Sequence, residues 1–362
     1  MGIAIKELIR RPSRFVSVGG ALTMLVVLLI VLGGFLDGLE LNSTGPYRAH
    51  EGRLLVFSEG SELLIQRSNV DTGQAEQLAA ADGVDAVGSL NQIASTASDR
   101  EGEIADIVLF GYDLPTDVIP SPPADGGAVI DQALGDRYDV AVGDTLLLGA
   151  SSEPVVVSAI VNDLSQGSPT VWLSTERWRE VVQSANAAAL PPEGTSQVFV
   201  VEASAGTDLA VLAPQLASVD GIAVATSEEA IQALPVVQQQ SSTFEGIIGV
   251  TFVVTLMVVA LFFTLITLER VDLYAVLKAL GARTSDLVAG ISAQAVGVSL
   301  VALVLGLGLS VAFVGLLPAD LPVRLEPVRL VQTAVGVLVS ALLGSLFTLR
   351  RVLRIDPAEA IG

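Results

Sequence analysis

Four long apolar segments constrain this chain more than any other feature of its sequence. They cover residues 15–36, 244–268, 287–317 and 330–349, and the stretches 246–268, 287–317 and 330–349 contain no charged residue. A helix needs about 20 apolar residues to cross roughly 30 Å of hydrocarbon. Uncharged stretches of this length are rare in soluble cores, so we expect four membrane-spanning helices, one near the N-terminus and three in the C-terminal third.

The composition agrees with a chain that is partly membrane-embedded and partly soluble. Of its 362 residues, 51% are hydrophobic, and the mean hydropathy is +0.64. The first apolar run follows a basic start, as in a signal peptide, but it is about 22 residues long, whereas the apolar region of a signal peptide has about 7–15. No clear cleavage site follows it, which favours an uncleaved span.

The distribution of charge predicts an orientation. Residues 1–14, 269–287 and 350–362 together hold ten Lys and Arg against six Asp and Glu, whereas the rest of the chain holds nine against 33. Basic segments stay on the cytoplasmic side of a membrane. We therefore expect a multi-pass protein of the plasma (inner) membrane with both termini in the cytoplasm and an acidic extracytoplasmic domain. The acidic domain argues against a nucleic-acid partner.

The segment between the first two spans has signals of a mixed domain. We expect an α+β domain inserted between transmembrane helices 1 and 2. Predicted strands cover residues 53–58, 107–112, 128–130, 145–148, 155–161, 170–173, 197–201 and 221–225, and predicted helices cover 71–81, 174–182, 208–218 and 227–234. The division is a cytoplasmic amphipathic helix (1–14), span 1 (15–40), the α+β domain (41–242), span 2 (243–268), a cytoplasmic loop with a coupling helix (269–287), span 3 (288–317), an outer loop (318–329), span 4 (330–349) and a cytoplasmic tail (350–362).

Residues that carry chemistry are sparse. The chain has no Cys and no phosphate-binding Gly-x-x-x-x-Gly-Lys-Ser/Thr loop. Its one histidine, His50, lies just beyond span 1, and we expect it to be a surface residue. We therefore predict no catalytic residue and no metal site. Asp37, Glu40 and Glu245 lie near the outer ends of spans, either as solvated ends or lining a site. Gly306 and Gly308 in span 3 either allow close helix packing or are simply tolerated there.

The cytoplasmic segments contain two motifs. After span 2, Glu269-Arg270 is followed by the run LKALGA at 277–282, in which Gly281 predicts the end of a helix. Thr284 or Ser285 is a suitable cap for a second short helix that opens with Asp286. The tail contains RIDPAEA at 354–360, with Asp356-Pro357 and Glu359.

These motifs resemble those of FtsX/MacB-type (type VII) ABC transporter permeases, with the DevC/HrtB-like branch the most similar. The resemblance covers residues 244–362 in motif and the whole chain in its one-plus-three architecture, and it implies a MacB-like permease fold. It implies a homodimer, surrounded by membrane lipid, that pairs with two copies of a separate ABC ATPase. ATP and Mg would then be bound by that ATPase, with no cofactor bound by this chain.

The resemblance also assigns roles to particular residues. Residues 281–286, which are Gly281, Ala282, Arg283, Thr284, Ser285 and Asp286, would couple the permease to the ATPase. Haem is a candidate transported ligand because HrtB-like members export haem. Candidate substrate contacts, none of which carries over securely, are Glu40, His50, Glu51 and Glu245.

Three functional hypotheses remain open besides efflux of a hydrophobic or amphiphilic compound by mechanotransmission. The first is a non-transporting FtsX-like mechanotransmitter that regulates cell-wall hydrolases; a domain of about 200 residues is larger than is typical of that group. The second is a lipoprotein-releasing permease. The third is a membrane-tethered receptor with no ATPase, which would leave the two cytoplasmic motifs without a role.

Overall fold

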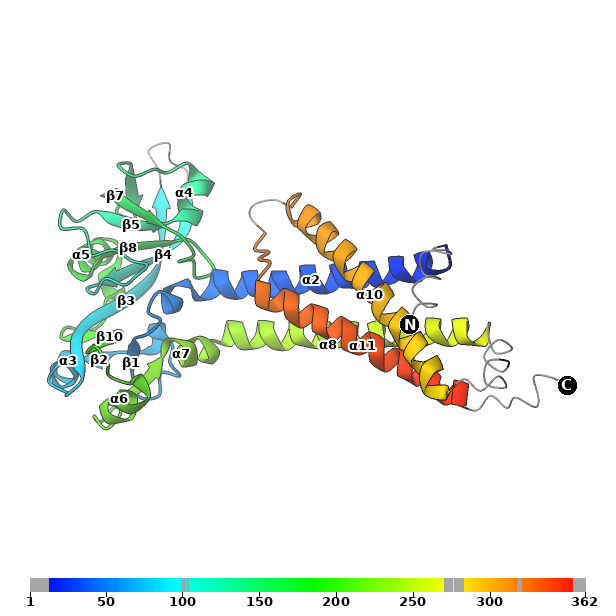
Figure 1. Cartoon of the computed structure of the whole chain (residues 1–362). Coiled ribbons are helices and arrows are strands. Elements are labelled where there is room, and N and C mark those ends of the chain that lie inside the picture. Colours follow the sequence, from blue (N-terminus) through cyan, green and yellow to red (C-terminus); the bar gives the residue numbers. More distant parts are fainter. Residues whose placement is uncertain are drawn as a thin grey trace. The chain divides into compact units, whose positions relative to one another are not determined.

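The computed structural model describes residues 13–98, 102, 104–269, 276, 283–317 and 321–353. The chain divides into two compact units (Figure 1). The membrane unit contains the chain up to Leu39 and from Gln240 onward, and the α/β domain is Glu40–Gln239. Two long helices, α2 (Ser13–Arg48) and α8 (Pro235–Leu268), begin in one unit and end in the other.

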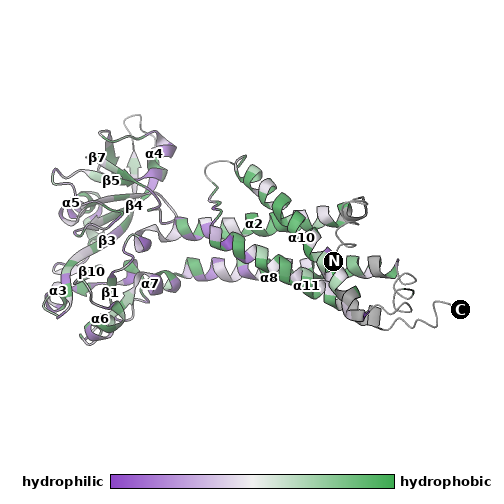
Figure 2. Cartoon of the chain, viewed as in Figure 1, coloured by the Kyte–Doolittle hydropathy of each residue, from purple (hydrophilic) through white to green (hydrophobic). Residues whose placement is uncertain are grey.

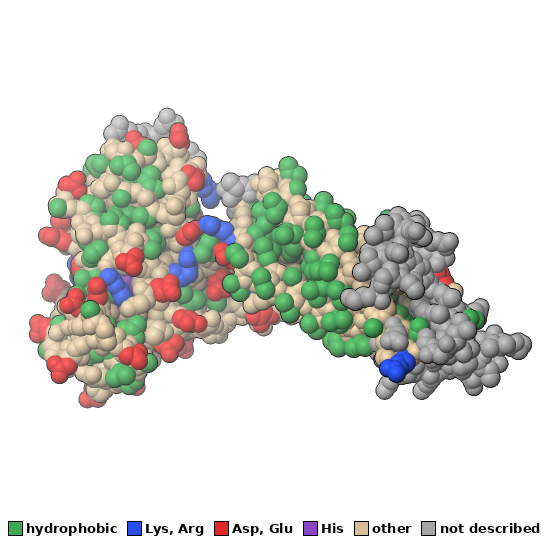
Figure 3. Space-filling model, viewed as in Figure 1, with side chains coloured by type: hydrophobic (Ala, Val, Ile, Leu, Met, Phe, Trp, Pro, Cys, Tyr) green, Lys and Arg blue, Asp and Glu red, His purple; other side chains and the backbone are tan. Residues whose placement is uncertain are grey.

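The membrane unit consists of long apolar helices. α2 and α8 are joined there by α10 (Thr284–Val314) and α11 (Pro327–Leu353), and all four are long and apolar enough to cross a membrane. Hydrophobic residues dominate these helices in Figure 2, and many hydrophobic side chains lie on their visible surface in Figure 3. Large side chains such as Val304, 72% exposed, point away from the unit. That exposure fits a lipid environment, because an apolar surface of this extent is unfavourable in water.

Small residues let these helices approach one another closely. A Cβ atom on Gly306 of α10 would lie 2.4 Å from Val26 of α2, and one on Gly336 of α11 would lie 2.5 Å from Phe252 of α8. A Cβ atom on Gly308 would meet nothing within 4 Å. The packing prediction is therefore confirmed for Gly306, whereas Gly308 makes no such contact within the chain. Close approach at small residues is how helices gain packing energy in lipid.

The α/β domain is built on one nine-stranded sheet with the strand order β11-β1-β10-β3-β4-β8-β5-β7-β6. Most of its neighbouring strands are antiparallel, but β4 pairs with β8 and β5 pairs with β7 in parallel. The strands are β1 (Leu54–Ser58), β3 (Val84–Ser98), β4 (Ile104–Tyr112), β5 (Ala128–Asp131), β6 (Thr145–Leu148), β7 (Glu153–Val161), β8 (Thr170–Ser174), β10 (Val198–Ala203) and β11 (Ile222–Thr226), with β2 (Val70–Asp71) and β9 (Thr195–Ser196) in a separate small sheet.

One long strand joins the two halves of this sheet. The first part of β3 pairs with β10, and its last residues, Ala97 and Ser98, also pair with β6. That second pairing closes a ring of six strands, β3-β4-β8-β5-β7-β6, which we call the six-stranded ring. The short helices of the domain are α3 (Thr72–Ala79), α4 (Gln132–Tyr138), α5 (Thr175–Asn186), α6 (Leu209–Leu216) and α7 (Ser227–Ala233).

Two large apolar clusters hold the ring in place. In one, side chains of the ring pack with those of α4 and α5, including Trp178, which is fully buried. In the other, Phe110 stacks on Trp172 with ring centroids 4.2 Å apart. This second cluster also contains Tyr47 from the end of α2 and Val237 from the start of α8. The core of the domain therefore includes the end of α2 and the start of α8.

All eight strands expected from the sequence are present, with ends that differ by at most three residues, and so are the four expected helices. The strand β3 was not expected, because most residues of VDAVGSLNQIASTAS are small or polar, few are β-branched and none is aromatic. The helix α4, which is only seven residues long, was not expected either. The first long helix continues to Arg48, beyond the expected end of span 1 at residue 40.

Candidate functional site: the linked helices and their anchors

The residues of the two cytoplasmic motifs, and residues 281–286 that are expected to couple to an ATPase, are only partly described. Gly281, Ala282, Arg270, Asp356, Pro357 and Glu359 lie outside the described residues, and Glu269 is exposed just after the end of α8. Arg283 has extended backbone and is the N-cap residue of α10. Thr284, Ser285 and Asp286 form the first turn of α10, so a short helix that opens at Asp286 is not separate from it. A force applied at these residues would act directly on a 31-residue helix.

A second group of residues lies where α2 leaves the membrane unit. The Arg329 guanidinium donates hydrogen bonds from Nε and Nη2 to Asp37 Oδ1, at 3.0 and 2.6 Å. The side chains of Asp37 and Arg329 are 12% and 28% exposed. An ion pair shielded to this degree interacts more strongly than one in water. It joins α2 to the first turn of α11.

An extended segment, residues 321–326, packs on the same side of α2, and we call it the strap. A Cβ atom on Gly38 would lie 1.9 Å from Pro322 O, and one on Gly34 would lie 2.6 Å from Arg324 O. The Arg324 N–H also donates to Gly34 O at 2.8 Å. Glycine is required at both positions because any side chain would overlap the backbone of the strap.

The end of α2 is anchored in the α/β domain by its backbone. The Gly45 N–H donates to Ser165 O at 3.1 Å, and the Gly167 N–H donates to Asn42 O at 2.7 Å. A Cβ atom on Gly45 would lie 2.4 Å from the carbonyl carbon of Leu164. The Arg48 guanidinium adds a bond to Asp163 O at 2.9 Å. These contacts attach the last turns of α2 to the loop between β7 and β8.

The start of α8 is anchored in the same domain. Leu234 and Val237, on either side of Pro235, are buried in the cluster that contains Trp172. The Ser227 hydroxyl at the start of α7 donates to Tyr47 O near the end of α2. The end of α2 and the start of α8 are therefore packed into a shared core of the α/β domain.

The prediction that His50 is a surface residue is wrong. His50 is 1% exposed, its Nδ1 lies 2.8 Å from Pro46 O, and its ring lies 6.3 Å from the ring of Trp172. Burial lowers the pKa of His50 to about 4, because the protonated imidazolium would lose its water. The continuation of α2 to Arg48 directs the chain into the core at this point, so His50 is not available to a substrate.

The other candidate substrate contacts are more accessible. Glu40 is a partly exposed residue of α2, whose carbonyl accepts the Thr44 hydroxyl, and Glu51 is exposed in the turn after that helix. Glu245 is exposed on α8. Their role in binding a substrate stays a prediction.

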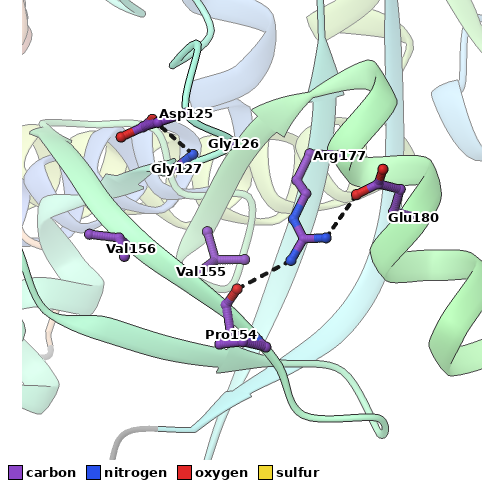
Figure 4. A pocket seen from close by; sticks show the side chains of 8 residues that line it. All are labelled: Asp125, Gly126, Gly127, Pro154, Val155, Val156, Arg177 and Glu180. Carbon is purple, nitrogen blue, oxygen red and sulfur yellow. Dashed lines mark hydrogen bonds and ion pairs between the residues drawn. The ribbon is translucent and has the colours of Figure 1, made fainter.

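A surface hollow of about 370 Å³ lies on the α/β domain (Figure 4). Arg177 crosses it, bonding Glu180 at 2.8 Å and Pro154 O at 3.2 Å, while Asp125 accepts the Gly127 N–H at 3.2 Å. The guanidinium thus already has a carboxylate and a carbonyl as partners, and it joins α5 to β7. The polar groups that line the hollow are therefore bonded to other groups of the domain.

Comparison with known proteins identifies the membrane part. Residues 246–357 match the family model of the FtsX-like permease C-terminal domain. That range contains most of α8 and the whole of α10 and α11. This part of the chain is therefore similar to FtsX-like permeases.

Individual relatives cover less than half of the chain. A protein of Staphylococcus haemolyticus named as a hemin transport system permease, HrtB, is 26% identical over 41% of this chain and 42% of its own length. An uncharacterized ABC transporter permease of Mycobacterium tuberculosis is 38% identical over 31% of each chain.

Among solved structures, the periplasmic region of MacB from Actinobacillus actinomycetemcomitans is 14% identical with a TM-score of 0.38, over 51% of this chain and 94% of that one. The extracellular domain of the transporter YknZ from Gram-positive bacteria is also 14% identical, with a TM-score of 0.34, over 48% of this chain and 100% of that one.

Proposed function

We propose that this chain is the permease, the membrane subunit, of an ABC efflux system that exports a hydrophobic or amphiphilic compound. A separate ATPase, in two copies, binds and hydrolyses ATP with Mg and drives a homodimer of this chain in the lipid bilayer. Haem is a candidate ligand, supported by the name of the HrtB relative. The main support for this proposal is that α2 and α8 are each one helix, with residues in the membrane unit and residues in the core of the α/β domain.

This continuity supports mechanotransmission. A helix transmits movement along its axis because each turn is fixed by backbone hydrogen bonds to the next. The domain ends of both helices are held by buried contacts, through Gly45 on α2 and Val237 on α8. Movement of the cytoplasmic ends is therefore passed to the domain instead of being lost in a linker.

We further propose that residues 281–286 receive the movement from the ATPase. The support is their position directly before and within the first turn of α10. In this proposal both termini lie in the cytoplasm and the α/β domain lies outside, as the distribution of charge predicts. Changing Asp286 to Ala is expected to leave the fold intact, since that residue is at the start of a long helix, but to lower export for each ATP hydrolysed.

Reconstitution tests the proposal. The chain and an ABC ATPase that copurifies with it are placed in lipid vesicles, and ATP-dependent movement of haem or of a fluorescent amphiphile is recorded. We expect transport with the active ATPase and none with an ATPase whose catalytic glutamate is changed to glutamine. ATP hydrolysis that responds to the permease while no amphiphile moves would contradict efflux.

That last outcome would favour the alternative of a non-transporting mechanotransmitter that acts on cell-wall hydrolases. The same anchored helices support it, because they would move the α/β domain whether or not a compound crosses the membrane. Stimulation of a purified cell-wall hydrolase by the ATP-loaded complex would establish it. Release of a lipoprotein from the vesicles would instead indicate a lipoprotein-releasing permease.

A further inference from the structure

The loop between β7 and β8 is the part of the six-stranded ring that is bonded to α2. Its backbone supplies Ser165 O to the Gly45 N–H and the Gly167 N–H to Asn42 O. We call residues 163–167 the grip loop. The backbone of Leu164 packs so closely on α2 that only glycine fits at position 45. Movement of α2 would therefore reach the ring through the backbone of this loop.

The grip loop needs support, because its own backbone is not regular. Asp163 and Gly167 both have positive φ, at 58° and 74°, which limits the bonds that the loop can make within itself. Besides the bond from Arg48 of α2 to Asp163 O, two side-chain links hold it to the ring. In the first, the Thr170 hydroxyl donates to Leu164 O at 3.1 Å and accepts a hydrogen bond from the Trp172 indole at 2.8 Å.

The second link is a buried carboxylate. The Ser165 hydroxyl donates to Asp131 Oδ2, and the Ala133 N–H donates to Asp131 Oδ1 at 3.3 Å. Asp131 is 1% exposed, and burial raises the pKa of its carboxyl above the usual range. A buried carboxylate is costly unless hydrogen bonds compensate for the lost water. Its bond from Ser165 is therefore stronger than one between neutral groups.

The position of Asp131 gives this link a direct connection to the ring. Asp131 is the last residue of β5, which pairs with β7 on one side and β8 on the other. The grip loop connects those same two strands. The bond between Ser165 and Asp131 thus ties the loop to the strand that lies between its two ends.

We propose that Asp131 is a positioning residue that holds the grip loop against α2 through Ser165 and passes the movement of α2 to the six-stranded ring. This inference rests on the proposed function, in which α2 transmits a force. On the α2 side, movement then passes through the buried pair of Ser165 and Asp131. The strand β5, rather than the exposed surface of the ring, is then the first element of the ring to be displaced.

Hydrogen exchange of the full chain in lipid nanodiscs tests the link without an ATPase. Ser165→Ala removes the donor but leaves Asp131 to cap α4. We expect about tenfold faster exchange of peptides that contain the Gly45 and Gly167 amides, the size of effect expected when a hydrogen bond to a charged group is lost. Ser165→Thr, which keeps the hydroxyl, should restore slow exchange. Ser184→Ala, which removes an exposed hydroxyl paired with Ser151, is the control and should change neither peptide.

Export in reconstituted vesicles completes the test. Ser165→Ala should reduce the compound moved per ATP by several-fold, while Ser165→Thr and Ser184→Ala behave as the unaltered chain. Unchanged exchange in Ser165→Ala, or faster exchange with unchanged export per ATP, would overturn the role of Asp131 and leave the proposed function standing. Absence of export by the unaltered chain would instead count against the proposed function, whereas the exchange measurement would still decide whether Asp131 holds the grip loop.

Discussion

Removing the carboxylate of Asp37 should weaken the membrane unit more than any exposed charge would. Asp37→Asn leaves the Arg329 guanidinium, 28% exposed, without its bidentate partner at the junction of α2 and α11. The matched changes are Arg329→Gln and the double variant. The strap keeps its own bond from the Arg324 N–H to Gly34 O in all of them, so the experiment isolates the ion pair.

The size of the effect follows from the geometry. Two unit charges about 4 Å apart attract by about 4 kcal/mol at an effective dielectric constant of about 20. The partial exposure of Asp37 and Arg329 lowers that value, and the interaction should fall between those of an exposed pair, about 0–1 kcal/mol, and a buried one. We therefore expect an interaction energy of about 2 kcal/mol in the double-mutant cycle.

The assay is reversible unfolding of the four proteins in mixed micelles, followed by tryptophan fluorescence or circular dichroism. Each single variant should lose roughly 2–3 kcal/mol of unfolding free energy, and the double variant should lose much less than the sum. The reversed pair, Asp37→Arg with Arg329→Asp, should recover part of the loss. Additive single effects, with an interaction energy below about 0.5 kcal/mol, would refute the claim that this pair joins α2 to α11.

Three other predictions use the same structure. Gly306→Val should lower the thermal stability of the chain in detergent by about 1–3 kcal/mol through overlap with Val26, whereas Gly308→Val, whose Cβ meets nothing within 4 Å, should not. Gly45→Ala should speed amide exchange in the last turns of α2, since its methyl group would overlap the grip loop; unchanged exchange would contradict the anchor. His50 is neutral in the fold, with a pKa of about 4 against 6.5 when unfolded, so stability should fall as the pH drops from about 6.5 to 4, by roughly 3 kcal/mol from this residue. The free energy of unfolding, measured by chemical denaturation, should depend less on pH in His50→Gln than in the unaltered chain. An equal pH dependence in the two proteins would argue against burial of His50.

The apolar runs were predictable from sequence because lipid requires long uncharged helices, and nothing later in the chain alters that requirement. Strands such as β6 were predictable because their β-branched and leucine-rich runs are bounded by glycine turns. The strand β3 was not, since it is held by pairing with β10 and β4 on its two sides rather than by its own propensity. The pairing with β10 depends on residues more than 100 positions away.

The candidate site was predictable only at the level of motifs. The cytoplasmic residues 281–286 were found by their resemblance to a family, and the structure describes just the last four of them. The glycines at 34 and 38 gave no signal, because their need for glycine comes from the backbone of the strap, almost 300 residues later in the chain. His50 was misjudged for a related reason: the end of a span does not reveal whether the helix continues into a folded core.

The proposed transmission requires α8 to move as a continuous helix, and replacing residues 240–243 tests that requirement most directly. Four glycines there would weaken the helix by about 4 kcal/mol relative to four alanines, at the same chain length. We predict that the alanine variant exports the compound in vesicles with the ATPase, while the glycine variant hydrolyses ATP at a similar rate with at least tenfold less export. Equal export by the two variants would contradict transmission through α8.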